Sequence, residues 1–305
     1  MGRLYTGCMD TMVLKGCYHG ASGATMGLTA LSTWYFNYPS AITTHKDSLK
    51  YCAPQGKMGP YFAESIMGVN GIVQFPKGYI KGAAEAVRAR GGVVIMDEVQ
   101  TGFGRTGDNF WGFQGHDVVP DIAVMAKGIA NGFPMAAVVT TKEIASVMDS
   151  AIHFNTFGGN PVGCAMASTV LDVIEDEKLQ ENARELGSYY LMGLAKLRDQ
   201  YEIVGDVRGK GFMMGIELVT DKDSKTALPK EQTLDILDDL KNMRLLCGKG
   251  GVAGNILRIQ PPLVTTKADV DYALGCFDLA FANHRDRQSK QETQFGEERK
   301  AHASM

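Results

Sequence analysis

The chain has 305 residues, of which 45% are hydrophobic, enough apolar sequence for one large domain or two ordinary domains with real cores. Its 31 Lys and Arg residues face 34 Asp and Glu residues, so the composition lacks the basic field that nucleic acid or an anionic membrane surface would require, and a small-molecule enzyme or a protein-binding module fits better. No apolar run approaches the roughly 20 residues that span a bilayer, so no membrane span is predicted. The six cysteines include no C-x-x-C pair, so neither a zinc site nor a disulfide framework is predicted.

The first half of the chain predicts short buried strands separated by helices and glycine turns. The segment TMVLKG predicts a strand that ends at Gly16, whereas residues 28 to 62 show no clear period and are expected to be loop. Residues 77 to 92 have the apolar spacing of a helix, with basic residues in the last turn. Apolar runs predict further strands at 93–97, 121–126 and 134–141. Because these runs do not alternate with polar residues, they indicate a largely parallel sheet that is covered on both faces.

The second half predicts longer helices and antiparallel strands. A helical region extends from Pro161 to Arg198 with a break near 175–178, and residues 202 to 219 predict two antiparallel strands. A helix from 230, a strand within 255–263 and a helix from 267 to about 284 follow. We therefore expect an α/β protein with an incomplete large domain at 1–170, a smaller α+β domain at 171–285 and a disordered polar tail at 286–305.

The stretch VVIMDEVQTGFGRTG, residues 93 to 107, allows three interpretations. Gly102, Gly104 and Gly107 have the G-x-G-x-x-G spacing of a dinucleotide-binding turn. The apolar run that ends in Asp97 and Glu98 is also typical of a metal-binding strand in nucleotide hydrolases. In the third interpretation, the strand ends in one carboxylate that holds a ring nitrogen of a cofactor.

The first two interpretations lack their expected context. A dinucleotide turn directly follows its strand and opens a helix, but here four residues separate Asp97 from Gly102, and helix-breaking residues follow Gly107. A P-loop needs Gly-Lys followed by Ser or Thr, and no Gly-Lys pair in the sequence meets this requirement.

Lys127 supports the third interpretation, because it follows a buried strand just as Asp97 does. The carboxyl ends of parallel strands open onto one crevice. A lysine amine and a carboxylate at one crevice suit pyridoxal 5′-phosphate, which needs the amine for a Schiff base and the carboxylate to keep its ring nitrogen protonated. Spacing alone leaves open that Asp97 caps a turn and that Lys127 is an ordinary surface lysine.

Four motifs decide between these alternatives. DEVQTGFGRTG, MAKGIANGFPMAA, FNTFGGNP and ILRIQPPL, in this order, resemble the class III aminotransferases, a fold type I family that depends on pyridoxal phosphate. The similarity extends from Leu4 to His284. It implies ping-pong transamination, in which an amino group passes from alanine or a related amino acid to glyoxylate or pyruvate. An ω-amino acid of the ornithine or 4-aminobutyrate type is the alternative donor.

The resemblance also implies the roles of the cofactor-binding residues. Lys127 would form the Schiff base and then move a proton as general base, and Asp97 would pair with the ring nitrogen. Glu98, Val99 and Gln100 would lie at the cofactor, with Val99 against one ring face and Gln100 near the phenolic oxygen. Tyr18 would stack on the opposite face, and we expect His19 to buttress its turn rather than to act in the chemistry.

Substrate and subunit contacts follow in the same way. Arg258 would bind the substrate carboxylate, and Glu64 would shield this arginine when the other end of a substrate is bound. Asn155 would contribute to the substrate site. Thr156 would reach the cofactor phosphate of the neighbouring subunit, which implies a homodimer with shared active sites.

The sequence departs from the family in three respects, which indicate an N-terminally truncated and internally shortened relative. The region from Thr33 to Tyr61 is much shorter than in family members and does not resemble them, and Ser65 stands where a proline is usual. Family members carry a phosphate-binding loop upstream of the point that matches Leu4, and we find no counterpart of it here. This leaves an alternative from another class, a catalytically dead relative that binds the cofactor poorly. The resemblance implies a mitochondrial location, although no targeting segment is recognisable in the sequence.

Overall fold

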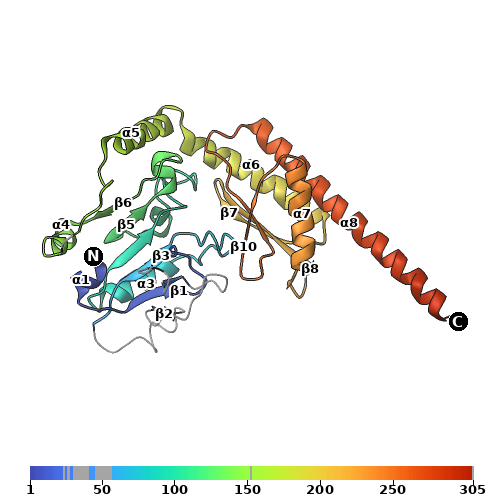
Figure 1. Ribbon diagram of the computed structural model, residues 1–305, viewed down its shortest axis with the longest axis horizontal. Coiled ribbons are helices and arrows are strands. Elements are labelled where there is room, and N and C mark those ends of the chain that lie inside the picture. Colours follow the sequence, from blue (N-terminus) through green and yellow to red (C-terminus); the bar gives the residue numbers. More distant parts are fainter. Residues whose placement is uncertain (23–24, 26–27, 30–40, 45–56, 152, 304–305) are drawn as a thin grey trace.

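The computed structural model describes residues 1–22, 25, 28–29, 41–44, 57–151 and 153–303, and two β-sheets organise them (Figure 1). The short helix α1 (Gly2–Thr6) precedes the first sheet, and the long helices α5 and α6 lead to the second.

The first sheet has six strands in the order β2-β1-β3-β4-β5-β6. All neighbours are parallel except β6, which runs antiparallel to β5. The strands are β1 (Thr11–Leu14), β2 (Ala41–Thr44), β3 (Tyr61–Glu64), β4 (Val94–Asp97), β5 (Ile122–Met125) and β6 (Ala137–Thr140). This confirms the mostly parallel α/β sheet, but the loop predicted over 28–62 is wrong at β2 and at the start of β3. Both strands have only four residues, too few to show a period.

Burial explains most of this sheet. Strands β1 and β3 are buried along their whole length, and helix α3 (Tyr79–Arg88) buries its apolar face, which consists of Ile80, Ala83, Ala84 and Val87. Strand β6 differs, because Val138 and Val139 are exposed. The prediction that the sheet is covered on both faces is therefore wrong at this edge within the described chain.

Helices α5 (Pro161–Asp176) and α6 (Leu179–Gln200) confirm the predicted broken helical region. The Asn160 side chain caps α5 by accepting a hydrogen bond from the Gly163 amide. Lys178 has a left-handed backbone with φ of 52°, which ends one helix axis and starts the next. The short helix α4 (Lys142–Ala145) and the 3₁₀ helices η2 (Gly112–His116), η3 (Lys127–Ala130) and η4 (Ser146–Met148) lie between β4 and α5.

The second sheet is antiparallel, with the order β10-β11-β8-β7 and with β9 paired to β8. Its strands are β7 (Val204–Lys210), β8 (Met213–Asp221), β9 (Thr226–Ala227), β10 (Gly248–Gly250) and β11 (Ile256–Ile259). Helices α6, α7 (Lys230–Asn242) and α8 (Lys267–Ala303) enclose a core around Leu194, Phe212, Phe277 and Phe281. The domain boundaries at 170 and 285 stay predictions.

Helix α8 continues to Ala303 and extends away from the rest of the molecule (Figure 1), through the tail that the sequence predicted to be disordered. Its Glu, Lys, Arg and Gln residues are strong helix formers, so the helix can propagate without an apolar face.

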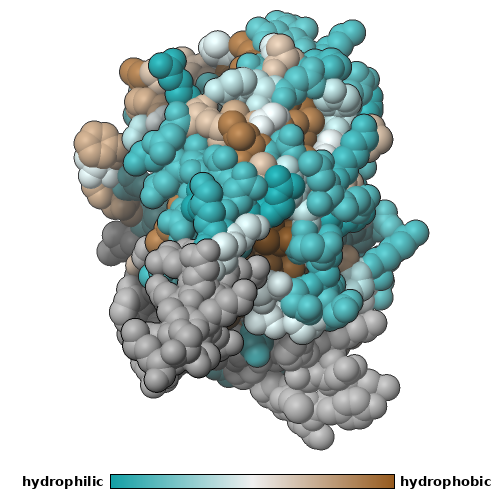
Figure 2. Space-filling model, turned by 90° about the vertical axis from the view of Figure 1, so that its right-hand side faces the viewer, coloured by the Kyte–Doolittle hydropathy of each residue, from teal (hydrophilic) through white to brown (hydrophobic). Residues whose placement is uncertain are grey.

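Figure 2 shows the side of the molecule that lies at the right in Figure 1, and its coloured surface is mainly hydrophilic, with only small apolar spots. None of the described helices is long and apolar enough to cross a bilayer.

Candidate active site

One edge of the parallel sheet gathers the predicted catalytic residues. Glu64 and Asp97 are paired neighbours at the carboxyl ends of β3 and β4. Lys127 follows the adjacent strand β5, and His19 follows β1. Because the carboxyl ends of parallel strands share one edge, residues from four separate segments meet there.

Asp97 is buried and held from two sides. Its Oδ2 lies 2.8 Å from His19 Nδ1, and its Oδ1 accepts a hydrogen bond of 3.1 Å from the Val99 amide. The His19 ring is also buried and lies 4.0 Å, between centroids, from the ring of Phe62. Burial lowers the pKa of His19, but the hydrogen bond to Asp97 and the interactions with Cys17 outweigh burial and raise that pKa to about 10. Asp97 is therefore an oriented carboxylate paired with an imidazolium.

Lys127 begins helix η3 with a left-handed backbone, φ 48°, which is uncommon for a residue with a side chain. Among the described residues, its ammonium forms no hydrogen bond and no ion pair. Lys127 is exposed, yet partial loss of hydration lowers its pKa. The nearby charge of Arg258 lowers it further, while Asp97 and Glu64 oppose this shift. The amine thus lies beside Asp97 without a partner of its own.

Glu64 contacts the backbone of two turns and forms no ion pair with Arg258. Its Oε1 accepts from the Tyr18 amide at 3.0 Å, and its Oε2 accepts from the Gly68 amide at 2.9 Å. Burial raises the pKa of Glu64 to about 7, with His19 lowering it and Asp97 raising it. Both carboxylate oxygens accept from the backbone, so Glu64 fixes the turns that carry Tyr18 and Gly68, and its shielding of the arginine stays a prediction.

Arg258 lies on β11 of the second sheet and bridges to the first. Its Nη2 donates to Gln100 Oε1 at 2.9 Å, and Gln260 Nε2 donates to the same oxygen at 3.1 Å. Arg258 Nε is buried and has no hydrogen-bond partner among the described residues. Loss of hydration lowers the pKa of Arg258, and the charge of Glu64 opposes this shift. The predicted position of Gln100 near a phenolic oxygen stays a prediction, because here its oxygen contacts Arg258.

The Glu98 side chain has a structural function. Its carboxylate accepts hydrogen bonds from the hydroxyls of Ser65 and Thr101 and from the amides of Gly112 and Phe113, between 2.6 and 2.9 Å. Burial raises its pKa, and these hydrogen bonds oppose the shift. The side chain therefore anchors the aromatic loop after β4, and a direct cofactor contact by Glu98 stays a prediction.

The glycines after Asp97 serve chain packing. Gly104 and Gly107 have φ of 74° and 80°, and a Cβ on Gly107 would lie 2.6 Å from the Arg184 Cα of helix α6. Arg105 donates to the carbonyl oxygens of Phe212 and Pro261, and burial lowers its pKa to about 10. The glycine spacing thus has an explanation without a dinucleotide.

Asn155 and Thr156 lie in an exposed loop before α5. Asn155 Oδ1 accepts from the Phe157 amide at 3.1 Å, a local turn contact. In the described part of the chain, neither residue forms a hydrogen bond with Asp97, Lys127 or Arg258. Their predicted roles stay predictions.

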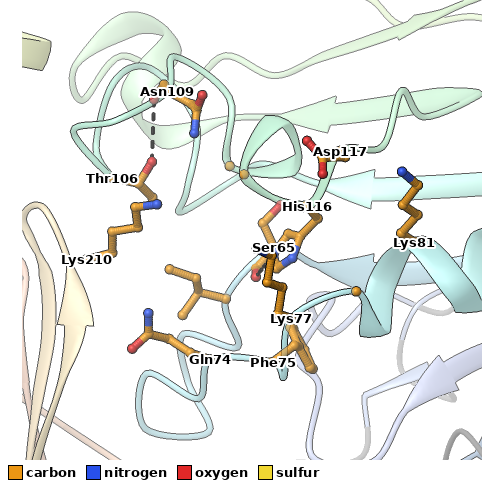
Figure 3. Close-up of a pocket in the computed structure, with 14 residues that line it drawn as sticks. Ser65, Gln74, Phe75, Lys77, Lys81, Thr106, Asn109, His116, Asp117 and Lys210 are labelled. Atoms are coloured by element: carbon orange, nitrogen blue, oxygen red, sulfur yellow. Dashed lines mark hydrogen bonds between the residues drawn. The ribbon is translucent and has the colours of Figure 1, made fainter.

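A cavity of about 340 Å³ lies elsewhere, between the β3–α3 connection and the second sheet (Figure 3). Lys77 and Lys81 lie at one side of it, and Lys210 reaches toward it from β7 (Figure 3). None of Asp97, Lys127 or Arg258 lines this cavity. Over the described residues, no group of His, Cys, Asp and Glu side chains could hold a metal ion.

The sequence analysis underestimated two residues. His19 directly contacts Asp97, and its place next to Tyr18 after a buried strand was the available signal. Gln260 gave none, because its contact with Gln100 spans 160 positions.

Comparisons with known proteins identify the family. The model of the family "Aminotransferase class-III" matches residues 3–281. The chain is 46% identical to human alanine–glyoxylate aminotransferase 2, mitochondrial, over 336 residues, which cover 95% of this chain and 65% of that protein. It is also 46% identical to an Arabidopsis thaliana homologue of that enzyme, covering 92% of this chain and 63% of the other. The chain thus spans less than two thirds of these relatives.

Solved structures agree. An aminotransferase from Bacillus anthracis aligns with a TM-score of 0.82 and 30% identity, over 90% of this chain and 69% of that one. A phospholyase from Arthrobacter, in complex with phosphoethanolamine, aligns with a TM-score of 0.85 and 31% identity, over 92% of this chain and 72% of that one. An amine transaminase from an uncultivated Pseudomonas species, solved in its PLP-bound form, aligns with a TM-score of 0.84 and 27% identity, over 92% of this chain and 72% of that one.

The matched family model and the site at the sheet edge agree, and the chain belongs to the class III aminotransferases, whose cofactor is pyridoxal 5′-phosphate.

Proposed function

We propose that this chain carries out pyridoxal-phosphate-dependent transamination, moving an amino group from alanine or a related amino acid to glyoxylate or pyruvate. One observation carries the proposal: the Lys127 amine, which has no partner in the part of the chain that the structure describes, lies at the same sheet edge as the buried Asp97–His19 pair. The names of the human and plant relatives support alanine and glyoxylate as substrates and a mitochondrial location.

The residues at this edge fit the ring end of the cofactor. An amine without a partner and an oriented, buried carboxylate are the two groups that a pyridoxal ring requires of its protein. When bound, the cofactor supplies a protonated ring that accepts the electrons of a substrate C–H bond. Val99 and Tyr18 support this fit, since their amides fix the carboxylates of Asp97 and Glu64.

Lys127 would hold the cofactor and then move a proton to and from the substrate carbon. A base must lose its own proton first, and the lowered pKa of Lys127 favours this. Asp97 would hold a proton on the ring nitrogen, and the contact with His19 would keep the Asp97 carboxylate oriented. Arg258 would bind the substrate carboxylate at the opposite end of the site.

The partner in this function would be a second copy of the chain. Phe154 and Phe157, which flank Asn155 and Thr156, are 81% and 79% exposed, and such apolar exposure is typical of protein interfaces. In a homodimer, Thr156 would reach the cofactor phosphate of the neighbouring subunit.

The chemistry at Lys127 is tested by covalent labelling. The full chain is incubated with pyridoxal phosphate, treated with borohydride, digested and analysed by mass spectrometry. We expect a reduced pyridoxyl group on Lys127, and no label at this site and no transamination after Lys127→Ala. Lys142→Ala, at an exposed lysine, is the matched control.

Labelling spread over surface lysines, or turnover that survives Lys127→Ala, would remove the assignment and favour the non-catalytic alternative. Turnover with alanine and glyoxylate, compared with ornithine or 4-aminobutyrate, distinguishes the proposed donor from the ω-amino alternative.

A further inference from the structure

Arg258, Gln100 and Gln260 form a donor cluster at the second-sheet side of the active site. Two donors, Arg258 Nη2 at 2.9 Å and Gln260 Nε2 at 3.1 Å, converge on one acceptor, Gln100 Oε1. Gln260 was not part of the predicted site. It is two residues beyond Arg258, directly after β11, so both side chains leave the strand on the same side.

This cluster has one oxygen too few. The Nε and Nη2 groups of a guanidinium share one edge and together match the two oxygens of a carboxylate. Gln100 brings a single amide oxygen, which satisfies Nη2 and leaves Arg258 Nε buried with no acceptor. A buried unpaired donor is costly, and a carboxylate in place of the amide oxygen would satisfy it.

The charges also favour replacing the Gln100 amide oxygen with a carboxylate. Among the described residues, Arg258 forms no ion pair, and both oxygens of Glu64, whose charge acts on Arg258, accept from backbone amides. The neutral amide of Gln100 leaves the guanidinium charge uncompensated. An incoming carboxylate brings both the missing oxygen and the missing negative charge.

We propose that Gln100 is an internal stand-in for the substrate carboxylate and that Gln260 is a third donor to that carboxylate beside Arg258. On binding, a monocarboxylate displaces the Gln100 oxygen and takes hydrogen bonds from Arg258 Nε, Arg258 Nη2 and Gln260 Nε2. This inference rests on the carboxylate-binding role proposed for Arg258. It adds a specificity residue and a competitor that lowers the apparent affinity.

The proposal predicts effects of opposite sign for the two glutamines. If Gln260 merely braced the loop, Gln260→Ala and Gln100→Ala would both loosen Arg258 and weaken binding. As a donor to substrate, Gln260 strengthens binding, whereas Gln100 competes with the substrate and weakens it.

The test uses propionate, an inert monocarboxylate, titrated into the full chain without added cofactor and followed by ligand-observed NMR. Propionamide, which has one oxygen and no charge, is the matched probe. We expect saturable binding of propionate but not of propionamide. Gln260→Ala should raise the propionate Kd about fivefold, the value of one net hydrogen bond of roughly 1 kcal/mol. Gln100→Ala should lower the Kd several-fold.

Two control variants separate the possible failures. Gln200→Ala removes an exposed glutamine that donates one side-chain hydrogen bond to Asp278, and should leave the Kd unchanged. Arg258→Ala should abolish saturable binding. If Arg258→Ala abolishes binding but the two glutamine variants weaken it equally or not at all, the further inference is wrong and the arginine assignment stands. If the unmodified chain does not bind propionate, both are wrong, while labelling of Lys127 still tests the catalytic assignment by itself.

Discussion

At the scale of single residues, the contact between Asp97 and His19 decides whether the buried carboxylate of the candidate site is stable in the fold. The two residues are 78 positions apart, and His19 Nδ1 lies 2.8 Å from Asp97 Oδ2. Taking one partner away from a buried charged pair leaves the other charge uncompensated, which costs more than the pair itself contributes. Among the described residues, the Val99 amide is the other hydrogen-bond partner of the Asp97 carboxylate.

We therefore expect His19→Ala to lower the free energy of unfolding by roughly 3 kcal/mol. Urea denaturation at neutral pH measures this loss. The exposed His153 provides the control, because His153→Ala should change stability by less than about 0.5 kcal/mol. An equal effect of the two substitutions would contradict the buried pair.

The same pair gives the stability a defined pH dependence. The pKa of His19 rises on folding from 6.5 to about 10, so the folded state binds this proton more tightly than the unfolded state. The contribution of His19 is fully present below pH 6.5 and is lost as the pH rises through 10. The stability difference between the unmodified chain and His19→Ala should shrink over this range, and a difference that grows with pH would show that His19 is buried in its neutral form.

At the scale of elements, the sequence predicted what depends on local pattern. The apolar runs before Asp97 and Lys127, the helix break at Lys178 and the hairpin of β7 and β8 all follow from residues close in the chain. Strands β2 and β3 were missed because four residues show no period, and their pairing with β1 is a long-range contact. The position of Asp97 and Lys127 at one sheet edge was predictable, because both follow apolar runs, whereas the contacts of Glu64 and Gln260 depend on how separate elements meet.

Helix α6 joins the two sheets through glycine contacts that no local pattern predicts. A Cβ on Gly187, inside α6, would lie 2.5 Å from the carbonyl carbon of Gly211 in the β7–β8 turn. Gly211 itself has φ of 55° and lies against the backbone of Thr106, close to the loop that follows Asp97. The second sheet is thus positioned relative to the catalytic loop by close backbone packing.

This packing predicts a reversal of helix propensity. Alanine is better than glycine inside a helix by about 1 kcal/mol, and Gly82→Ala in α3, with open space around the position, should be stabilising by about that amount. Gly187→Ala should instead destabilise by roughly 1–3 kcal/mol, because the clash is with backbone that cannot move aside. Thermal unfolding of the two variants measures both effects, and stabilisation by Gly187→Ala would contradict the close packing.

At the scale of the whole molecule, the exposed apolar residues are grouped. Val138 and Val139 of β6, Phe154 and Phe157 of the following loop, and Val162 and Met166 of α5 are all exposed. Helix α4, strand β6 and helix α5 lie on the same side of the molecule (Figure 1). Within the described chain, this side contrasts with the mainly hydrophilic surface seen in Figure 2. A homodimer with shared sites needs an apolar surface beside Thr156 that the second chain would cover.

Phe157→Asp tests this assembly. A large apolar side chain that is 79% exposed in one chain becomes a buried anchor in the dimer, and a carboxylate there should weaken association by roughly 2 kcal/mol or more, about 30-fold in Kd. Sedimentation at micromolar concentration should give about twice the 33.0 kDa of one chain for the unmodified protein and a shift toward monomer for the variant. Leu246→Asp, at a leucine that is 88% exposed between α7 and β10, should leave the mass unchanged. A chain that is monomeric at all concentrations would overturn the homodimer, and the role of Thr156 at a neighbouring site would be overturned with it.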